Sequence, residues 1–173
     1  ACLVAIMCQG PGYHRQTEKT LRDVCREDAP DTKIVTSAGA LIDSLHAIGA
    51  KKISIITPYM KNLTTLVTDY IESESIEVID AISLEVPNNL KVGVLDPLDL
   101  LSIVDKLCVR DADAVVLSAC VQMPSLAALA PAQARFDVPV LSTAAARVFQ
   151  ILRALDIRAQ VPGAGMLLSG DYE

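Results

Sequence analysis

Two of the five cysteines stand where a thiol could do chemistry. Cys2 belongs to an apolar run at the start of the sequence, and Cys120 follows the most strand-like segment, 113–117. Each is expected at the end of a strand, before a loop that leads into a helix. Free backbone N–H groups and the positive end of the helix dipole favour a thiolate there. The pair therefore predicts nucleophilic or acid–base chemistry, although either cysteine alone could be a small buried hydrophobic residue.

Other polar residues also follow predicted strands. Tyr59 comes directly after the strand 52–56, and its hydroxyl could donate to a bound carboxylate or could remain in water. Pro87-Asn88-Asn89 follows the strand 77–84 and, taken alone, is typical of a turn. The remaining cysteines are expected to be structural and the histidines to be solvated on helices: Cys8, Cys25, Cys108, His14 and His46.

Strand-like and helix-like segments alternate along the sequence, which predicts parallel strand–helix–strand units and an α/β fold. The predicted strands are a buried strand end at 1–7, then 33–36, 52–56, 77–84, 113–117 and 138–141. The predicted helices are 14–26, 38–48, 63–72, 97–107, one that opens at Pro124, and 144–155. Ligands of such folds bind at the carboxyl edge of the sheet, where the cysteines are expected.

The sequence also contains an internal echo. Ala1-Cys2-Leu3-Val4 resembles Ala119-Cys120-Val121-Gln122, and each is followed by two hydroxyl residues and a small-residue helix start, at 36–40 and 142–146. Small residues produce such echoes by chance, so duplication and coincidence stay equally open. A duplication would give two related lobes, each with one cysteine at its sheet edge.

Composition excludes several classes of protein. Hydrophobic residues make up 51% and aromatic residues only 3%, which predicts a folded chain with an aliphatic core. The net charge of -6 argues against a nucleic-acid partner, and no apolar run reaches the ~20 residues of a membrane span. The odd cysteine count, without Cys-x-x-Cys or zinc-ligand spacing, predicts reduced thiols, no metal and a cytoplasmic protein.

Five motifs in combination resemble the maleate isomerases, within the aspartate/glutamate/hydantoin racemase superfamily. They are Ala1-Cys2-Leu3-Val4-Ala5-Ile6-Met7, Thr36-Ser37-Ala38-Gly39-Ala40-Leu41, Ile56-Thr57-Pro58-Tyr59-Met60-Lys61, Leu84-Glu85-Val86-Pro87-Asn88-Asn89 and Ser118-Ala119-Cys120-Val121-Gln122-Met123. Pro162-Gly163-Ala164-Gly165 also fits, so the resemblance extends from Ala1 to about Gly170.

The resemblance implies two Rossmann-like lobes with parallel sheets, related by pseudo-twofold symmetry, and an active site between them. Residues 1–50 would be the remainder of lobe one, completed by 143–173, and residues 51–142 would form lobe two. The family begins with a further strand and a Pro-Ser-Ser-Asn loop whose asparagine holds substrate. That segment is not in this sequence, so lobe one is expected to be incomplete at its N-terminal side.

The resemblance also implies the roles of the site residues. Cys2 would attack the alkene carbon of maleate, and Cys120 would donate and later remove a proton, so that rotation about the single bond gives fumarate. The substrate carboxylates would be bound by two side chains and four backbone amides: Tyr59, Asn89, Leu3, Val4, Val121 and Gln122. Family members use no cofactor, are generally homodimers and act in nicotinate-type degradation.

Three other functions stay open. A two-cysteine racemase of aspartate- or glutamate-type amino acids would usually have Thr after each cysteine, whereas this sequence has Leu3 and Val121. An arylmalonate decarboxylase typically keeps only the second cysteine, so Cys2 counts against it. A non-catalytic module that binds dicarboxylates or senses redox state would bind without turnover.

Overall fold

A parallel sheet of four strands forms the centre of the protein in the computed structural model, which describes residues 3–172. The strands are β1 (Lys52–Thr57), β2 (Glu77–Ser83), β3 (Ala114–Ser118) and β4 (Val140–Ser142). They lie in the order β2-β1-β3-β4, and every neighbouring pair is parallel. The predicted α/β class and these four strands are confirmed.

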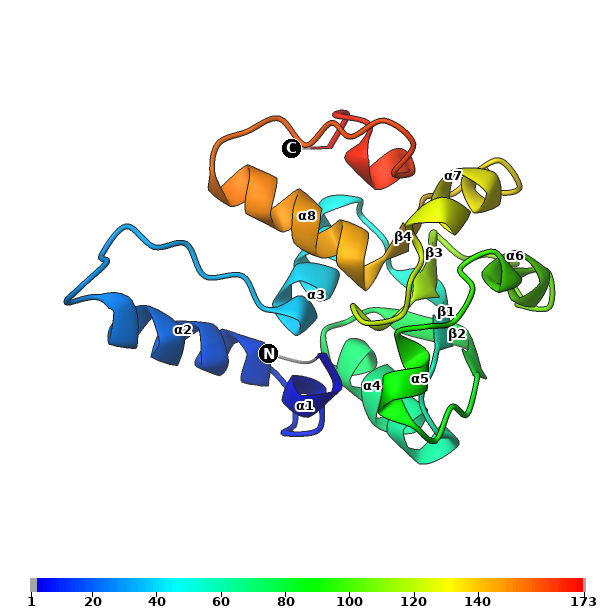
Figure 1. The fold of residues 1–173 in the computed structure, drawn as a ribbon, viewed down its shortest axis with the longest axis horizontal. Helices are drawn as coiled ribbons and strands as arrows, with labels where there is room; N and C mark the ends of the chain where they lie inside the picture. Colours follow the sequence, from blue (N-terminus) through cyan, green and yellow to red (C-terminus); the bar gives the residue numbers. More distant parts are fainter. Residues whose placement is uncertain (1–2, 173) are drawn as a thin grey trace.

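Helices cover both faces of the sheet, as Figure 1 shows: α3, α4 and α8 lie on one side, and α6 and α7 on the other. The helices are α1 (Leu3–Met7), α2 (Tyr13–Cys25), α3 (Ser37–Ala47), α4 (Lys61–Ser73), α5 (Asn89–Val92), α6 (Asp99–Val104), α7 (Leu126–Gln133) and α8 (Thr143–Ala154), with a 3-10 turn at Met166–Leu168. None of the helices within residues 3–172 is long and apolar enough to cross a bilayer.

The core is aliphatic and centred on β1, β3 and β4. Every residue of β3 and β4 is buried, and in β1 only Lys52 is exposed. Strands covered on both faces carry continuous apolar runs, which explains why they were predictable from sequence. β2 lies at one edge of the sheet and is only half-buried.

Two predicted strand segments are wrong. From Leu3 onward the apolar run forms the helix α1, in which Leu3, Ile6 and Met7 are buried at helical spacing. A short apolar run cannot be assigned to strand or helix by periodicity alone. Residues 33–36 pair with no strand in the part of the chain that the structure describes. Instead, the backbone N–H of Thr36 donates to Glu18 Oε1 at 3.1 Å, and α3 begins directly afterwards.

The echoed segments 36–40 and 142–146 have the same local structure. Thr36 caps α3 by accepting the backbone N–H of Gly39 at 3.0 Å, and Ser142 caps α8 by accepting that of Ala145 at 3.3 Å. Each hydroxyl satisfies a donor that the first helical turn leaves without a partner. The two helices then pack against each other.

Candidate active site at the carboxyl edge of the sheet

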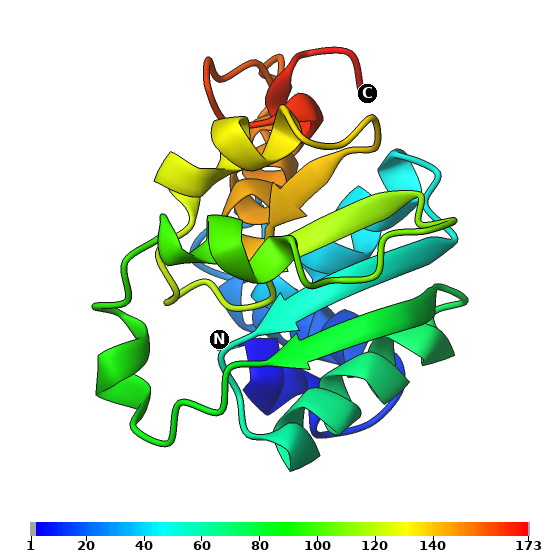
Figure 2. The same cartoon turned by 90° about the vertical axis from the view of Figure 1, so that its right-hand side faces the viewer.

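The chain reverses its direction of travel across the sheet between β1 and β3. From β1 it passes through α4 to β2 on one side, and it later returns through α6 to place β3 on the other side of β1. In open parallel sheets the loops that leave two such strands diverge, and ligands bind in the crevice at their carboxyl ends. Figure 2 shows the arrowheads of β1 and β2 pointing to this edge, with α1 beside them.

Tyr59 and Cys120 lie in the two loops that flank this switch point. The Tyr59 hydroxyl donates to the backbone carbonyl of Ala119 at 3.2 Å, and its side chain is 9% exposed. Cys120 is 3% exposed, and its carbonyl accepts the Ser118 hydroxyl at 3.0 Å. The fold therefore brings the predicted tyrosine and the second predicted cysteine to one place and fixes the backbone between them.

Hydroxyl groups join the ends of the neighbouring strands. All four strands end in a hydroxyl residue: Thr57, Ser83, Ser118 and Ser142. Thr64 Oγ1 of α4 lies 2.6 Å from Thr57 Oγ1 and accepts the Ser83 hydroxyl at 2.7 Å. Because Thr57, Thr64 and Ser83 are neutral and mutually bonded, they hold the ends of β1 and β2 in place without adding charge to the edge.

Asn89 and Gln122, both predicted to bind substrate, are linked to each other by a hydrogen bond that the sequence did not predict. The Asn89 side chain is exposed at the start of α5, where Asn88 caps the helix by accepting the backbone N–H of Leu90 at 2.9 Å. Gln122 Nε2 donates to the backbone carbonyl of Asn89 at 2.8 Å. The expected turn at 87–89 thus continues into a short helix that is tied to the Cys120 loop, residues 119–125.

The remaining predicted site residues lie on α1 and in the Cys120 loop. Leu3 is buried and Val4 half-buried in the first turn of α1, where backbone N–H groups have no acceptor within the helix. Val121 is half-buried directly after Cys120. Cys2 lies outside the described residues, so its predicted position next to Cys120 stays a prediction.

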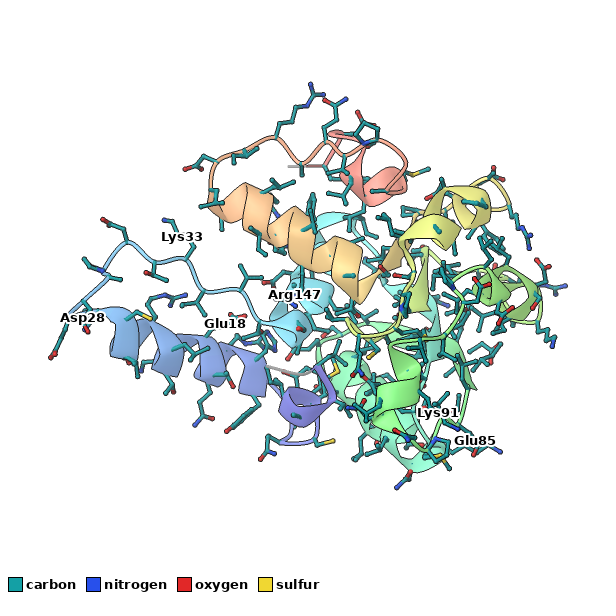
Figure 3. All side chains as sticks on the ribbon, viewed as in Figure 1. Glu18, Asp28, Lys33, Glu85, Lys91 and Arg147 are labelled. Carbon is teal, nitrogen blue, oxygen red and sulfur yellow. The ribbon has the colours of Figure 1, made fainter. Side chains whose placement is uncertain are left out.

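Charged side chains stay at the periphery of this edge. Lys61 Nζ lies 3.8 Å from Glu85 Oε2, and both side chains are substantially exposed. Figure 3 shows Glu85 and Lys91 pointing outward near α5. Within residues 3–172 no group of three or more His, Cys, Asp or Glu side chains could hold a metal ion. An anion bound here would meet neutral O–H and N–H donors, a pattern suited to negative charge that moves during a reaction.

Sequence reasoning missed a buried cluster between α2 and α4, and the prediction that His14 is solvated is wrong. His14 is 1% exposed, and its Nδ1 lies 2.5 Å from the Tyr70 hydroxyl oxygen, which also accepts the His14 backbone N–H at 3.1 Å. Arg15 Nη1 lies 3.1 Å from His14 Nε2 and forms a bidentate ion pair with Glu74. Because Tyr70 is 56 residues away, no local pattern marks the contact.

The chemistry of this cluster fixes the state of the histidine. A guanidinium can only donate, so Nε2 of His14 accepts from Arg15 and Nδ1 carries the proton that bonds to Tyr70. Burial lowers the pKa of His14 below its ordinary value, and the charge of Arg15 acts in the same direction. His14 is therefore a neutral structural residue. Arg147 of α8, which Figure 3 shows beside α3, was also not singled out from the sequence. Its buried Nε has no hydrogen-bond partner among the described residues.

Comparison with known proteins places this geometry among related enzymes. The family model for arylmalonate decarboxylase matches residues 1–168. A maleate isomerase of Geobacillus stearothermophilus is 54% identical over 172 residues, which are 99% of this chain and 68% of that protein. The chain thus spans about two thirds of the length of this relative.

Two solved structures extend the comparison to bound molecules. The maleate isomerase Iso from Pseudomonas putida S16, a cysteine-to-alanine variant crystallised with maleate, superposes with a TM-score of 0.96 at 50% identity. The alignment covers 99% of this chain and 69% of that one. A Nocardia farcinica maleate cis-trans isomerase, a cysteine-to-serine mutant with a covalently bound succinylcysteine intermediate, gives 0.94 at 39% identity, covering 98% and 69%.

Proposed function

Because the chain belongs to the maleate isomerases, within the family that the arylmalonate decarboxylase model describes, we propose that it converts maleate to fumarate without a cofactor. The observation that carries the proposal is the position of Cys120. It is buried beside Tyr59 at the switch point of the sheet, in a fold that superposes on a maleate-bound relative.

The reaction begins with attack of the Cys2 thiolate on one alkene carbon of maleate. The sulfur–carbon bond forms as the π pair moves toward the far carboxylate, where negative charge accumulates. The Cys120 thiol then protonates the carbon next to that carboxylate, which leaves a succinyl group on Cys2 and a thiolate on Cys120. A succinylcysteine in the Nocardia farcinica relative supports this intermediate.

Rotation and elimination complete the reaction. The former double bond is single in the succinyl intermediate, so the carboxylates can turn from cis to trans. The Cys120 thiolate removes the proton that it gave, the double bond re-forms, and the Cys2 thiolate leaves. Fumarate is released with both thiols in their starting states.

The groups around Cys120 have the chemistry to stabilise the charge. In this proposal Tyr59, Asn89 and the backbone N–H groups of Leu3, Val4, Val121 and Gln122 bind the two carboxylates. Fixed neutral donors stabilise charge that develops at a carboxylate and need no reorganisation during the reaction. The net charge of -6 makes such local donors important, because the chain as a whole does not attract a dianion.

The division into lobes is part of the proposal. Residues 51–142 contain all four described strands, and α8 leaves the sheet to pack against α3. This arrangement supports one lobe formed by 51–142 and a second formed by 1–50 together with 143–173, related by pseudo-twofold symmetry with the substrate between them. We also propose a cytoplasmic homodimer, in which the thiols stay reduced. The cysteines within 3–172 are all free, and light scattering of the purified protein would test the dimer.

The experiment uses the protein in its natural full length, incubated with maleate and followed by proton NMR and intact-mass analysis. We expect fumarate, and Cys2→Ser should lower kcat by at least about a thousandfold because the nucleophile is lost. Cys120→Ser should slow turnover and trap the succinyl adduct. Cys108→Ser is the matched control, since Cys108 is exposed and has no part in the proposed mechanism.

The opposite result is equally clear. If Cys2→Ser turns over normally, the covalent mechanism is wrong. If the wild-type protein forms neither fumarate nor an adduct, the isomerase function is wrong. Racemisation of aspartate would then favour the racemase alternative, and stoichiometric binding of maleate alone would favour the binding module.

A further inference from the structure

Residues 87–95, the α5 strap, have few contacts that hold them to the rest of the molecule. The strap follows a well-fixed start, where the backbone N–H groups of Glu85 and Val86 donate to the carbonyls of Tyr59 and Pro58. Beyond that point the strap is largely exposed, with Leu90 at 79% and Val94 at 81%.

The bond from the Gln122 side chain is the strap's link to the Cys120 loop. Among the described residues, the hydrogen bonds of 87–95 are internal to the strap, except for the one that Gln122 Nε2 donates to the Asn89 carbonyl at 2.8 Å. Apolar contact adds a second hold, because Val92 is 3% exposed and Leu95 lines a cavity of about 210 Å³ that Met123 also lines.

The Gln122 side chain lies against the Asn89 carbonyl and against Gly93, the residue that follows α5. Its amide bonds the first residue of the helix, and a Cβ built on Gly93, the residue that ends the helix, would lie 3.5 Å from Gln122 Cγ and Nε2. A four-residue helix has little stability of its own, so its position depends on such contacts.

We propose that Gln122 is a positioning residue, whose side chain holds Asn89 where it can bind the substrate carboxylate. This inference rests on the proposed function, in which Asn89 binds substrate and Gln122 contributes only its backbone N–H. Gln122 belongs to the loop that carries Cys120, so its side chain ties the position of Asn89 to that loop. The acid–base group of Cys120 and the carboxylate-binding group of Asn89 therefore keep a fixed distance from each other.

The test is a double-mutant cycle in the full-length protein. Gln122→Met keeps the length of the side chain and the backbone N–H but removes the donor. We expect kcat/KM for maleate to fall about tenfold, mainly through a higher KM, because a mispositioned Asn89 weakens binding in the ground state and transition state alike. In an Asn89→Ala background the same change should have less than about a twofold effect, because the two residues act as one unit. Gln16→Met is the matched control, since Gln16 is exposed on α2.

Hydrogen exchange of the strap gives a second measurement that does not depend on turnover. Amides of 87–95 should exchange faster in Gln122→Met than in the wild type and the control. Unchanged KM and unchanged exchange would overturn the proposal, as would an equal loss in the presence and absence of the Asn89 side chain. If the wild type does not isomerise maleate, the proposed function fails, while the exchange measurement still decides whether Gln122 holds the strap.

Discussion

Two polar clusters in this protein use different chemistry to join distant segments. At the sheet edge, Thr57, Thr64 and Ser83 are joined by neutral hydroxyl groups, and Tyr59 bonds a carbonyl. Between α2 and α4, the cluster of His14, Arg15, Tyr70 and Glu74 contains ionisable groups and a bidentate ion pair.

The neutral cluster lies at the proposed active site, whereas the ionisable cluster attaches α2 to α4. A site for a dianion is disturbed little by neutral hydroxyls, whose bonds do not change with pH near neutrality. The cluster of His14, Arg15, Tyr70 and Glu74, called the α2–α4 joint below, lies away from the strand ends. Its charged groups can therefore link the two helices without acting on substrate. The edge cluster should therefore be the pH-independent one, and the joint the pH-dependent one.

The largest effect is expected at the joint. Tyr70→Phe removes the oxygen that accepts both the backbone N–H and the Nδ1–H of the buried His14. Two buried donors without acceptors should lower the free energy of unfolding by about 2–3 kcal/mol. Urea unfolding measures this, with Tyr13→Phe as control because the Tyr13 hydroxyl makes no hydrogen bond to any of the residues 3–172. A loss below that of the control would show that the joint does not depend on this oxygen.

A smaller effect is expected at the edge. Thr64→Val keeps the shape of the side chain but removes the acceptor of Ser83 and the partner of Thr57. Each of those hydroxyls can rotate toward another acceptor, so the expected loss is about 1–2 kcal/mol in urea unfolding. Thr65→Val, on the exposed face of the same helix, should cost less than about 0.5 kcal/mol. Equal losses at 64 and 65 would contradict a structural role for the edge cluster.

Tyr59→Phe should cost still less stability, about 1 kcal/mol or below. The carbonyl of the buried Ala119 loses a donor at 3.2 Å, and the net contribution of one such hydrogen bond is typically about 0.5–1.5 kcal/mol. Its activity should fall further than its stability, because the proposed carboxylate donor is lost. Circular dichroism melting beside maleate turnover separates the two, and a variant with full activity would remove Tyr59 from the proposed site.

The smallest expected effect is a pH dependence of stability that belongs to the joint. The pKa of His14 is lowered from 6.5 by burial and by Arg15, so the unfolded state binds a proton more readily than the folded state. The stabilisation is complete above pH 6.5 and is lost as the pH falls through the lowered value. Burial and Glu18 raise the pKa of Asp43, and its protonation acts in the opposite direction.

The comparison of two proteins isolates the histidine. Urea midpoints at several pH values from 7.5 to about 5 should fall more steeply for the wild type than for His14→Gln. Parallel curves would show that His14 does not titrate against folding in this range. The edge variant Thr64→Val should keep the wild-type slope.

The sequence was most informative where apolar burial dictates the structure. β1 and β3 are buried runs between turn signals, and both were predicted to within about one residue. The two hydroxyl caps were visible as the echo of 36–40 and 142–146. The segment 33–36 has a strand-like pattern, but a sequence pattern does not show whether a neighbouring strand is available to pair with it. In the structure the Thr36 N–H donates to the Glu18 side chain instead.

The candidate site was predictable in part for the same reason. Tyr59 and Cys120 could be placed at one edge because parallel strands end together, and the structure joins their loops. The bond between Gln122 and Asn89 could not be predicted, because it links two exposed residues 33 positions apart. Burial of His14 was hidden because α2 buries this histidine while its apolar residues Leu21 and Val24 are exposed.

The hydroxyl residues that end all four strands have a consequence for protein engineering. Thr57 and Ser83 anchor the bases of their loops through Thr64 of the covering helix α4, so the middle of either loop can change without loss of this anchor. A designer can therefore graft new sequence between Pro87 and Leu95 while retaining Ser83 and the strand below it. Because the strand ends are anchored separately from the loops, related enzymes could change their loops, and with them their chemistry, while keeping the same sheet.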